Sequence, residues 1–279
     1  MKEETIKYKT PLVYYGGKQR ISDWICKMIP KHRIYCEPFF GGGAVFFTKT
    51  PSFLEVINDK NECLVNFYLQ IQNNFEKLAA KICTTLHSES MYLRARQIYN
   101  GKIQVDDLEK AVATWIVFTQ SRLASANAGW KYDNGTGGSH YGIIELHNRK
   151  NFCRWLQKRL SKVQISCRDA IQVIRNRDTE DTFFYLDPPY PSANQGHYAG
   201  YTFDDLEELL CCLKNVKGKF ALSNYPSPLI DHYVQLMGWH IYTMKMKKDS
   251  TMARQKGAEK EEILVTNYIP PSITQLTLF

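Results

Sequence analysis

The stretch IYCEPFFGGGAVFFTKTPSFLEVIND, residues 34–59, decides the fold. Its short apolar run at 34–36 predicts a strand, and the three glycines at 41–43 predict a tight turn into a helix. A second apolar run at 53–57 predicts another strand, which ends beside Asp59. The order of strand, glycine-rich turn, helix, strand and acid is typical of a nucleotide-binding βαβ unit.

The same alternation of strands and helices returns after residue 163. Apolar runs predict further strands at 163–167, 182–186, 220–222, 239–244 and 263–268. Helical spacing of apolar residues predicts helices at 170–175, 204–213 and 228–237, and also dominates 62–118 and 151–160. The segment 124–147 is rich in glycine, asparagine and aromatic residues and is predicted to be a long loop. We therefore predict one α/β sheet domain that is split by a mostly helical insertion at 62–162.

Composition and charge narrow the class of protein. Hydrophobic residues make up 44% and charged residues 23% of the 279, which excludes a disordered chain and a coiled coil. Lys and Arg number 36 against 28 Asp and Glu, and the resulting charge of +8 favours an anionic partner such as nucleic acid. A basic surface without such a partner is the alternative that charge alone leaves open.

Several classes of segment are absent from the sequence. No apolar run approaches the ~18 residues that a membrane span needs, and residues 1–10 have no apolar signal core. The eight cysteines form no C-x-x-C pair and no zinc-like spacing with histidine, so we expect reduced thiols and no metal. These features predict a cytoplasmic protein that does not bind a membrane.

The sharpest motif is Asp187-Pro188-Pro189-Tyr190, directly after the apolar strand at 182–186. In open α/β sheets, ligands bind just outside the carboxyl ends of such strands. The two prolines stiffen the turn and remove two N–H donors, so the carbonyl groups there have fewer local partners. A carboxylate beside a carbonyl accepts two hydrogen bonds from one NH₂ group, and the tyrosine ring offers a base a stacking face. An ordinary turn at the end of a strand is the alternative.

Two glycine-containing motifs predict a second ligand. In EPFFGGG at 37–43 the glycines let the backbone approach a ligand, but the spacing is neither G-x-G-x-x-G nor a P-loop. Asp59 then follows the next strand, where an acid can accept hydrogen bonds from ribose hydroxyls. YYGGK at 14–18 places two glycines and a lysine before a helix, which suits a carboxylate ligand. The alternatives are a tight turn with a capping aspartate and a plain surface turn.

Together these three motifs resemble the Dam-like family of DNA adenine-N6 methyltransferases. YYGGK resembles the family's N-terminal motif, EPFFGGG resembles its F-x-G-x-G cofactor loop starting at Phe39, and DPPY at 187–190 resembles its catalytic tetrapeptide. The resemblance implies the Rossmann-like α/β sheet of S-adenosylmethionine-dependent methyltransferases, with a mostly helical inserted DNA-recognition domain. It divides the chain into a catalytic domain at 1–61 and 163–269, the insertion at 62–162 and a C-terminal tail at 270–279.

The resemblance also implies a reaction and the residues that carry it. S-adenosylmethionine is the expected cofactor and methyl donor, and no metal is needed. The implied catalytic residues, which hold the amino group of a flipped-out adenine in double-stranded DNA, are Asp187, Pro188 and Tyr190. The implied cofactor-binding residues are Tyr14, Lys18, Phe39, Gly41, Gly43, Asp59, Asp169 and Asp187.

DNA contacts are expected from two basic segments. The residues concerned are Arg122, Trp130, Lys131, Tyr132, His140 and Arg149 in the long loop, and Lys247, Lys248 and Arg254 nearer the C-terminus. The final residues, Gln275-Leu276-Thr277-Leu278-Phe279, resemble the pentapeptide by which bacterial proteins dock on the replication sliding clamp. Packing of this tail on its own domain is the alternative. We further expect a monomer in a bacterial or phage cytoplasm, with restriction–modification as one setting.

Two other functions remain open from the sequence. One is methyl transfer to another acceptor, such as N4 of cytosine, RNA or a protein amide, although such enzymes more often carry Ser or Asn where Asp187 stands. The other is a catalytically silent DNA-binding module, against which the intact Asp187, Tyr190, Lys18 and Asp59 argue. The recognised bases do not follow from the sequence, because specificity depends on loop conformation in a groove.

Overall fold

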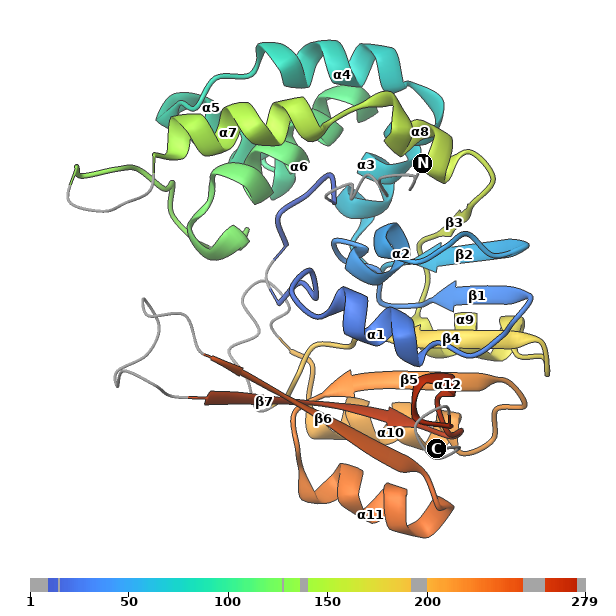
Figure 1. Cartoon of the computed structure of the whole chain (residues 1–279). Helices are drawn as coiled ribbons and strands as arrows, with labels where there is room; N and C mark the ends of the chain where they lie inside the picture. The colour runs from blue at the N-terminus through green and yellow to red at the C-terminus, as the bar shows by residue number, and fades with distance from the viewer. Residues whose placement is uncertain are drawn as a thin grey trace, which may run out of the picture. The chain divides into compact units, whose positions relative to one another are not determined.

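The computed structural model of the chain describes residues 10–14, 16–126, 128–135, 140–191, 200–247 and 259–274. Within these residues the strands are β1 (Ile34–Glu37), β2 (Leu54–Asn58), β3 (Gln164–Ser166), β4 (Thr182–Leu186), β5 (Lys219–Asn224), β6 (His240–Lys247) and β7 (Glu259–Thr266). These strands form one sheet in the order β3-β2-β1-β4-β5-β7-β6 (Figure 1). The predicted Rossmann-like α/β sheet is confirmed by this order, in which strands wind outward in both directions from β1.

The pairing of the strands follows their apolar pattern. β4 is buried along its whole length, because it pairs in parallel with β1 on one side and with β5 on the other. A continuous apolar run is what a strand covered on both faces needs. β2 and β3 also pair in parallel, whereas β7 runs antiparallel between β5 and β6. The hairpin β6–β7 therefore brings a late segment of the chain beside β5.

Helices connect the strands. The helices of the described residues are α1 (Ser22–Met28), α2 (Ala44–Thr48), α3 (Glu62–Asn73), α4 (Phe75–Thr84), α5 (Glu89–Tyr99), α6 (Asp107–Gln120), the 3-10 helix η1 (Arg122–Ala124), α7 (Tyr141–Asn151), α8 (Arg154–Leu160), α9 (Ala170–Arg177), α10 (Phe203–Leu213), α11 (Pro228–Met237) and α12 (Pro271–Thr274). Several begin at a capping side chain, as α3 does at Asn61 and α10 at Thr202. Among the described helices, none combines the length and the apolar character that crossing a bilayer requires.

The chain divides into two compact units. The first unit contains Met1–Cys26, Phe40–Pro51 and Glu55–Arg168, and the second unit contains Lys27–Phe39, Ser52–Leu54 and Asp169–Phe279. In the first unit, α3 packs against α6 and α8, and α5 packs against α6, around fully buried rings such as Trp115. The predicted insertion at 62–162 holds α3 to α8, and its role as a DNA-recognition domain stays a prediction.

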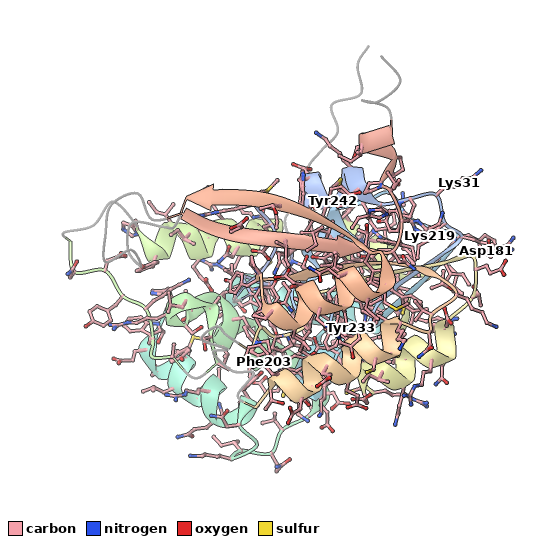
Figure 2. The ribbon with its side chains drawn as sticks, turned by 90° about the horizontal axis from the view of Figure 1, so that it is seen from below. Lys31, Asp181, Phe203, Lys219, Tyr233 and Tyr242 are labelled. Carbon is pink, nitrogen blue, oxygen red and sulfur yellow. The ribbon has the colours of Figure 1, made fainter. Side chains whose placement is uncertain are left out.

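In the second unit, helices pack beside one another along the strands. α10 packs against both α9 and α11. Figure 2 shows Phe203 at the start of α10 and Tyr233 on α11, on the side of the strands away from Tyr242. Leu206 and Leu210 of α10 are buried, which agrees with the apolar stripe that predicts this helix.

The long loop predicted at 124–147 is wrong in its second part, because α7 begins at Tyr141. His140 caps this helix, since a ring nitrogen of His140 accepts a hydrogen bond from the Ile143 N–H at 3.4 Å. The helical pattern is hard to detect in the sequence because α7 exposes Ile143 and buries Glu145, the reverse of an amphipathic surface helix. The helix predicted at 151–160 is shorter in the structure, where α8 begins at Arg154.

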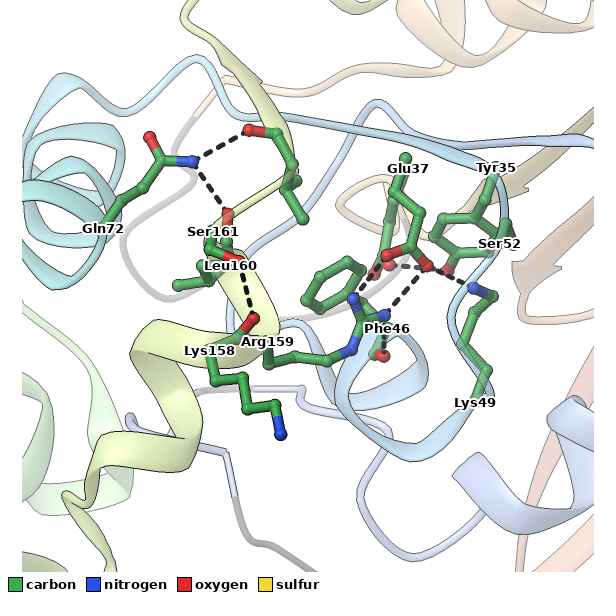
Figure 3. A network of polar contacts seen from close by, with 12 residues as sticks. Tyr35, Glu37, Phe46, Lys49, Ser52, Gln72, Lys158, Arg159, Leu160 and Ser161 are labelled. Atoms are coloured by element: carbon green, nitrogen blue, oxygen red, sulfur yellow. Dashed lines mark hydrogen bonds and ion pairs between the residues drawn. The ribbon is translucent and has the colours of Figure 1, made fainter.

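A buried ion cluster joins β2, α8 and the end of α2 in the first unit (Figure 3). Arg159 donates to both carboxylate oxygens of Glu55, and Lys49 donates to the same carboxylate at 2.5 Å. The Arg159 guanidinium also donates to the Phe46 carbonyl at 3.0 Å and lies 3.6 Å from the centroid of the Phe46 ring. Burial raises the pKa of Glu55, but the hydrogen bond of Arg159 and the charges of Lys49 and Arg159 outweigh it, and the pKa is lowered.

Candidate functional site

The carboxyl ends of β1, β4 and β5 lie side by side in the second unit, because these strands are parallel neighbours. Glu37, Asp187 and Asn224 therefore gather at one edge of the sheet, at the end of a strand or directly after it. Lys31 and Lys219, which Figure 2 labels, lie at the opposite edge, near the amino ends of β1 and β5. The edge predicted to bind a ligand is thus the edge that carries the DPPY motif.

Asp187 and Tyr190 come together at this edge with Glu262 of β7. The Tyr190 hydroxyl lies 3.1 Å from Asp187 Oδ1 and 2.7 Å from Glu262 Oε1. The Tyr190 ring packs edge-on against the Tyr225 ring, with centroids 4.6 Å apart. Tyr190 and Glu262 are buried, whereas Asp187 is half-buried. The carboxylate of the motif is therefore the group that a ligand can reach.

The hydroxyls of Tyr185 and Tyr190 keep their protons. Burial raises the pKa of Tyr190 well above its ordinary value, and the charges of Asp187 and Glu262 raise it further. The pKa of Tyr185, whose hydroxyl lies 3.0 Å from that of Ser223, is raised by burial and by the charge of Asp187. Because a protonated phenol donates a hydrogen bond, Tyr190 acts as a donor toward the two carboxylates.

The glycine turn at 41–43 lies in the first unit and is held by Asp59. The Gly41 N–H donates to Asp59 Oδ2 at 2.8 Å, and the Asn61 N–H donates to Asp59 Oδ1 at 2.9 Å. Gly41 and Gly43 have φ angles of 49° and 66°, a region that other residues rarely adopt. The Lys60 backbone N–H is a third donor to this carboxylate. A carboxylate has about four lone-pair sites, so Asp59 retains acceptor capacity beyond these three bonds.

Tyr14 lies against the glycine turn, four positions before a buried lysine. A Cβ atom on Gly41 would come within 2.7 Å of the Tyr14 ring. The same ring packs against Phe118, with centroids 5.0 Å apart. Lys18 is buried, and its ammonium donates to the Gly16 carbonyl at 3.1 Å. The structure thus places one aromatic face against the turn and a lysine ammonium inside the first unit.

Phe39 and Asp169, both in the second unit, interact with Tyr201. The rings of Phe39 and Tyr201 meet edge-on, with centroids 6.5 Å apart. Burial raises the pKa of Tyr201, and the charges of Asp205, Glu208 and Asp169 add to the effect. The Asp169 carboxylate also caps α9 by accepting hydrogen bonds from its first N–H groups. Aromatic rings beside a carboxylate suit the face and the amino group of a purine.

The turn that follows α6 in the first unit is closed by backbone pairing. The Arg122 N–H donates to the Gly129 carbonyl at 2.9 Å, and Ser121 pairs with Trp130 as an isolated antiparallel bridge. Leu123 has a φ of 58°, which a branched side chain adopts only when its surroundings require it. Residues held in such a conformation cluster at functional sites.

Four of the residues predicted to contact DNA form one group on this turn, which we call the aromatic–basic cluster: Arg122, Trp130, Lys131 and Tyr132. The Trp130 ring stacks on the Tyr132 ring with centroids 5.9 Å apart, and the Arg122 guanidinium lies 5.1 Å from the Tyr132 centroid. The Lys131 ammonium lies 5.3 Å from the Tyr141 centroid, and burial lowers the pKa of Lys131. Rings for stacking and cations for phosphates are the two components of a nucleic-acid surface.

The other residues predicted to contact DNA lie elsewhere. His140 caps α7, and Arg149 donates to a backbone carbonyl of α4 at 3.2 Å. Lys247 is the last residue of β6. The predictions that fall outside the described residues concern Lys248, Arg254 and the tail from Gln275 to Phe279. Their roles in DNA binding and clamp docking stay predictions.

Sequence reasoning missed three residues: Glu262, Asn224 and Tyr201. Asn224 is 2% exposed, and its side-chain NH₂ group has no hydrogen-bond partner among the described residues. A buried donor of this kind needs a partner, which a ligand can supply. The only signal in the sequence was polarity at an unexpected place, since Asn224 ends an apolar strand and Glu262 stands directly before the apolar run at 263–265.

Comparison with known proteins adds an independent observation. A family model described as D12 class N6 adenine-specific DNA methyltransferase matches residues 14–248. The Type II methyltransferase M1.LlaDCHI of Lactococcus lactis subsp. cremoris is 27% identical over 270 residues, which cover 91% of this chain and 93% of that protein. The Type II methyltransferase M.MjaIII of Methanocaldococcus jannaschii is 26% identical over 300 residues, which cover 94% of this chain and 100% of that protein. The DNA N-6-adenine-methyltransferase of Escherichia phage P1 is 27% identical over 240 residues, which cover 81% of this chain and 31% of that protein.

Proposed function

The chain belongs to the D12 class N6 adenine-specific DNA methyltransferase family, and we propose that Asp187, Pro188 and Tyr190 hold the acceptor in its reaction. The enzyme transfers a methyl group from S-adenosylmethionine to N6 of adenine in DNA. One observation supports the residue assignment: the half-buried Asp187 carboxylate and the Tyr190 ring come together at the carboxyl end of β4. Methyl transfer that survives removal of the Asp187 carboxylate would count against it.

The first unit fits S-adenosylmethionine. A Cβ atom at any position of the turn 41–43 would come within 2.8 Å of Tyr14 or Phe40, so only bare backbone fits there. In this proposal Asp59 accepts a hydrogen bond from a ribose hydroxyl, and the buried Lys18 ammonium meets the methionine carboxylate. When bound, S-adenosylmethionine supplies an electrophilic methyl group on its sulfonium sulfur. Within the described residues, no cluster of three or more metal-ligating side chains accompanies the turn.

The second unit offers a group that fits a purine. Phe39 and Tyr201 supply aromatic faces, and Asp169 supplies a carboxylate that can accept a hydrogen bond from an amino group. We assign this group to the adenine end of the cofactor. The Tyr201 assignment is new relative to the sequence motifs and is supported by the edge-on contact of its ring with Phe39.

The acceptor chemistry follows from the DPPY motif. Adenine N6 is a weak nucleophile, because its lone pair is delocalised into the ring. Asp187 and the Pro188 carbonyl each accept one amino hydrogen, which favours a pyramidal nitrogen with an available lone pair. These bonds strengthen as the transition state forms, so they lower its free energy more than that of the bound base. Tyr190 stacks on the base, which leaves the duplex because its amino group is otherwise out of reach.

Asp59 is expected to make cofactor binding depend on pH. Burial raises the pKa of Asp59, against the opposing backbone N–H groups of Asn61, Gly41 and Lys60. A carboxyl that gains a proton loses acceptor capacity, so affinity for S-adenosylmethionine should fall as the pH falls through this raised pKa. Asp59→Asn should bind the cofactor about 10-fold more weakly and should lose the pH dependence. Calorimetric titration with S-adenosylmethionine over a series of pH values measures both effects.

The control for this experiment is Glu62→Gln, which removes an exposed acid three positions further along the chain. Glu62→Gln should keep both the affinity and the pH dependence of the wild type. The same pH dependence in Asp59→Asn as in the wild type would show that another group titrates.

The aromatic–basic cluster is the surface that we propose for DNA contact in the first unit. Arg122 lies over the Tyr132 ring and Lys131 over the Tyr141 ring, so positive charge and aromatic rings that can contact bases occur together on this turn. The charge of +8 supports an anionic partner for the whole protein. The same proposal includes double-stranded DNA as substrate, a monomer in the cytoplasm, and docking of residues 275–279 on the sliding clamp, each supported by the sequence alone.

Arg122→Gln is expected to weaken DNA binding and to reduce its salt dependence. The slope of log affinity against log salt concentration is negative, and the loss of one phosphate contact reduces its magnitude by about 0.9. Titration of labelled duplex DNA by fluorescence anisotropy at several salt concentrations gives this slope. Arg154→Gln is the matched control, because Arg154 is exposed on α8 and pairs there with Glu76. Equal slopes for Arg122→Gln and the wild type would remove Arg122 from the interface.

A further inference from the structure

Asn61 links Asp59 to Tyr99 in the first unit. Its backbone N–H donates to Asp59 Oδ1 at 2.9 Å, and its side-chain NH₂ group donates to the Tyr99 hydroxyl oxygen at 2.6 Å. The helix α3 fixes the orientation of this side chain, because Asn61 Oδ1 accepts hydrogen bonds from the N–H groups of Cys63 and Leu64. The amide nitrogen of Asn61 therefore faces Tyr99, and the Tyr99 hydroxyl oxygen acts as an acceptor.

The proton of the Tyr99 hydroxyl is left for another group. A tyrosine hydroxyl can accept one hydrogen bond and donate another at the same time. Among the described residues, no atom accepts the Tyr99 proton. Burial raises the pKa of Tyr99 more than the hydrogen bond from Asn61 lowers it, so the hydroxyl stays protonated. The side chain is half-buried, and a ligand can therefore reach this donor.

Tyr99 lies beside the glycine turn at 41–43. Its ring meets the Phe118 ring edge-on, with centroids 5.7 Å apart, and Phe118 packs in turn against Tyr14, the ring that a Cβ atom on Gly41 would touch. Asp59, whose charge contributes to the raised pKa of Tyr99, accepts the hydrogen bond of the Gly41 N–H at 2.8 Å. The unused donor of Tyr99 and the acceptor of Asp59 are therefore neighbours at the same turn.

A sugar hydroxyl matches this pair of groups. It donates its own hydrogen to a carboxylate while its oxygen accepts the hydrogen of a phenol, so one OH group satisfies both side chains. The carboxylate of a ligand would be repelled by Asp59, and the amino group of a purine would leave the Tyr99 proton unused.

We infer that Tyr99 binds the ribose of S-adenosylmethionine: its hydroxyl donates to the oxygen of a ribose hydroxyl whose proton Asp59 accepts. This inference rests on the proposed role of Asp59. Tyr99 belongs to α5, within the insertion at 62–162. The insertion thus contributes a residue to the cofactor site in addition to its proposed contacts with DNA.

The test is calorimetric titration of Tyr99→Phe and of the wild type with three ligands: S-adenosylhomocysteine, which has the same ribose but no methyl group to transfer, and its 2′-deoxy and 3′-deoxy analogues. Tyr99→Phe keeps the ring and should bind S-adenosylhomocysteine about 5- to 10-fold more weakly than the wild type does. One of the two analogues lacks the hydroxyl that Tyr99 contacts. The two proteins should bind that analogue with equal affinity, and the other analogue should show the full difference.

The analogues separate a ribose contact from a merely structural role. Equal losses for all three ligands would overturn the inference, because the hydroxyl would then only support Asn61. An unchanged affinity for S-adenosylhomocysteine would overturn it as well. The matched control is Tyr92→Phe, which removes a hydroxyl from the same helix, one that donates to the Ala128 carbonyl, and it should keep the wild-type affinities.

Asp59→Asn in the same titration tests the proposed function separately. A wild-type affinity of Asp59→Asn for S-adenosylhomocysteine would reject the ribose site itself. A loss in Asp59→Asn without any loss in Tyr99→Phe would reject only the role of Tyr99.

Discussion

Asp187→Ala is expected to lower kcat for methyl transfer by about 10²- to 10³-fold, the loss typical of removing one preorganised hydrogen-bonding group. The variant lacks the carboxylate that accepts an amino hydrogen of adenine, and the amino nitrogen then stays conjugated with the ring. DNA affinity should change by less than about 2-fold, because most of it comes from phosphate contacts. Single-turnover transfer of a tritiated methyl group gives the rate, and fluorescence anisotropy gives the affinity.

Two variants calibrate this result. Asp187→Asn keeps one carbonyl oxygen of nearly the same size, so it should retain more activity than Asp187→Ala. Asp204→Ala removes an exposed acid in the first turn of α10, in the same unit, and should keep the wild-type rate. A wild-type rate in Asp187→Ala would contradict the mechanism, and so would a loss of rate explained wholly by weaker DNA binding.

Glu55→Ala is expected to lower the free energy of unfolding by about 3–5 kcal/mol, the usual result of removing one partner of a buried ion pair. Without Glu55, the buried charges of Arg159 and Lys49 lose the carboxylate that both of them contact. The Arg159 guanidinium would keep its contacts with Phe46, which do not compensate for a lost charge. Urea titration followed by tryptophan fluorescence measures the change.

The control is Glu76→Ala, because Glu76 pairs with Arg154 on the surface of the same unit. An exposed pair contributes about 0–1 kcal/mol, so equal losses in the two variants would contradict the role given to burial. The pH dependence provides a second check. The pKa of Glu55 is lowered in the folded protein, so its contribution is present above the ordinary carboxyl pKa and is lost as the pH falls through the lowered value. Glu55→Gln should flatten this acid limb.

Strands and their motifs could be predicted from the sequence because their signals are local. The run at 182–186 is apolar at nearly every position, and the structure buries all of it as β4. The glycines at 41–43 precede α2 as expected, with Gly43 in the left-handed conformation at its N-cap. Asp59 stands directly after β2, as the βαβ pattern predicts. In each case a few consecutive residues determine the element.

The residues that were not predicted depend on pairing between distant segments. Glu262 lies 72 positions after Tyr190 in the chain. It reaches Tyr190 only because β7 enters the sheet beside β5. The hairpin β6–β7 is also longer than its apolar runs predict, since charged residues at Lys245 and Glu261 occupy opposing register positions. α7 was missed for a related reason, because the acid that it buries, Glu145, accepts a hydrogen bond from Gln120 of α6.

The insertion of β7 between β5 and β6 has a consequence for biosynthesis. β5 and β6 leave the ribosome before β7, so the edge of β5 that pairs with β7 stays unpaired until β7 is synthesised. Such an unpaired edge can pair with another chain, so a nascent chain at this stage is prone to aggregation. A polypeptide released before β7 is made therefore lacks both the neighbour of β5 and Glu262, whose carboxylate accepts a hydrogen bond from the Tyr190 hydroxyl.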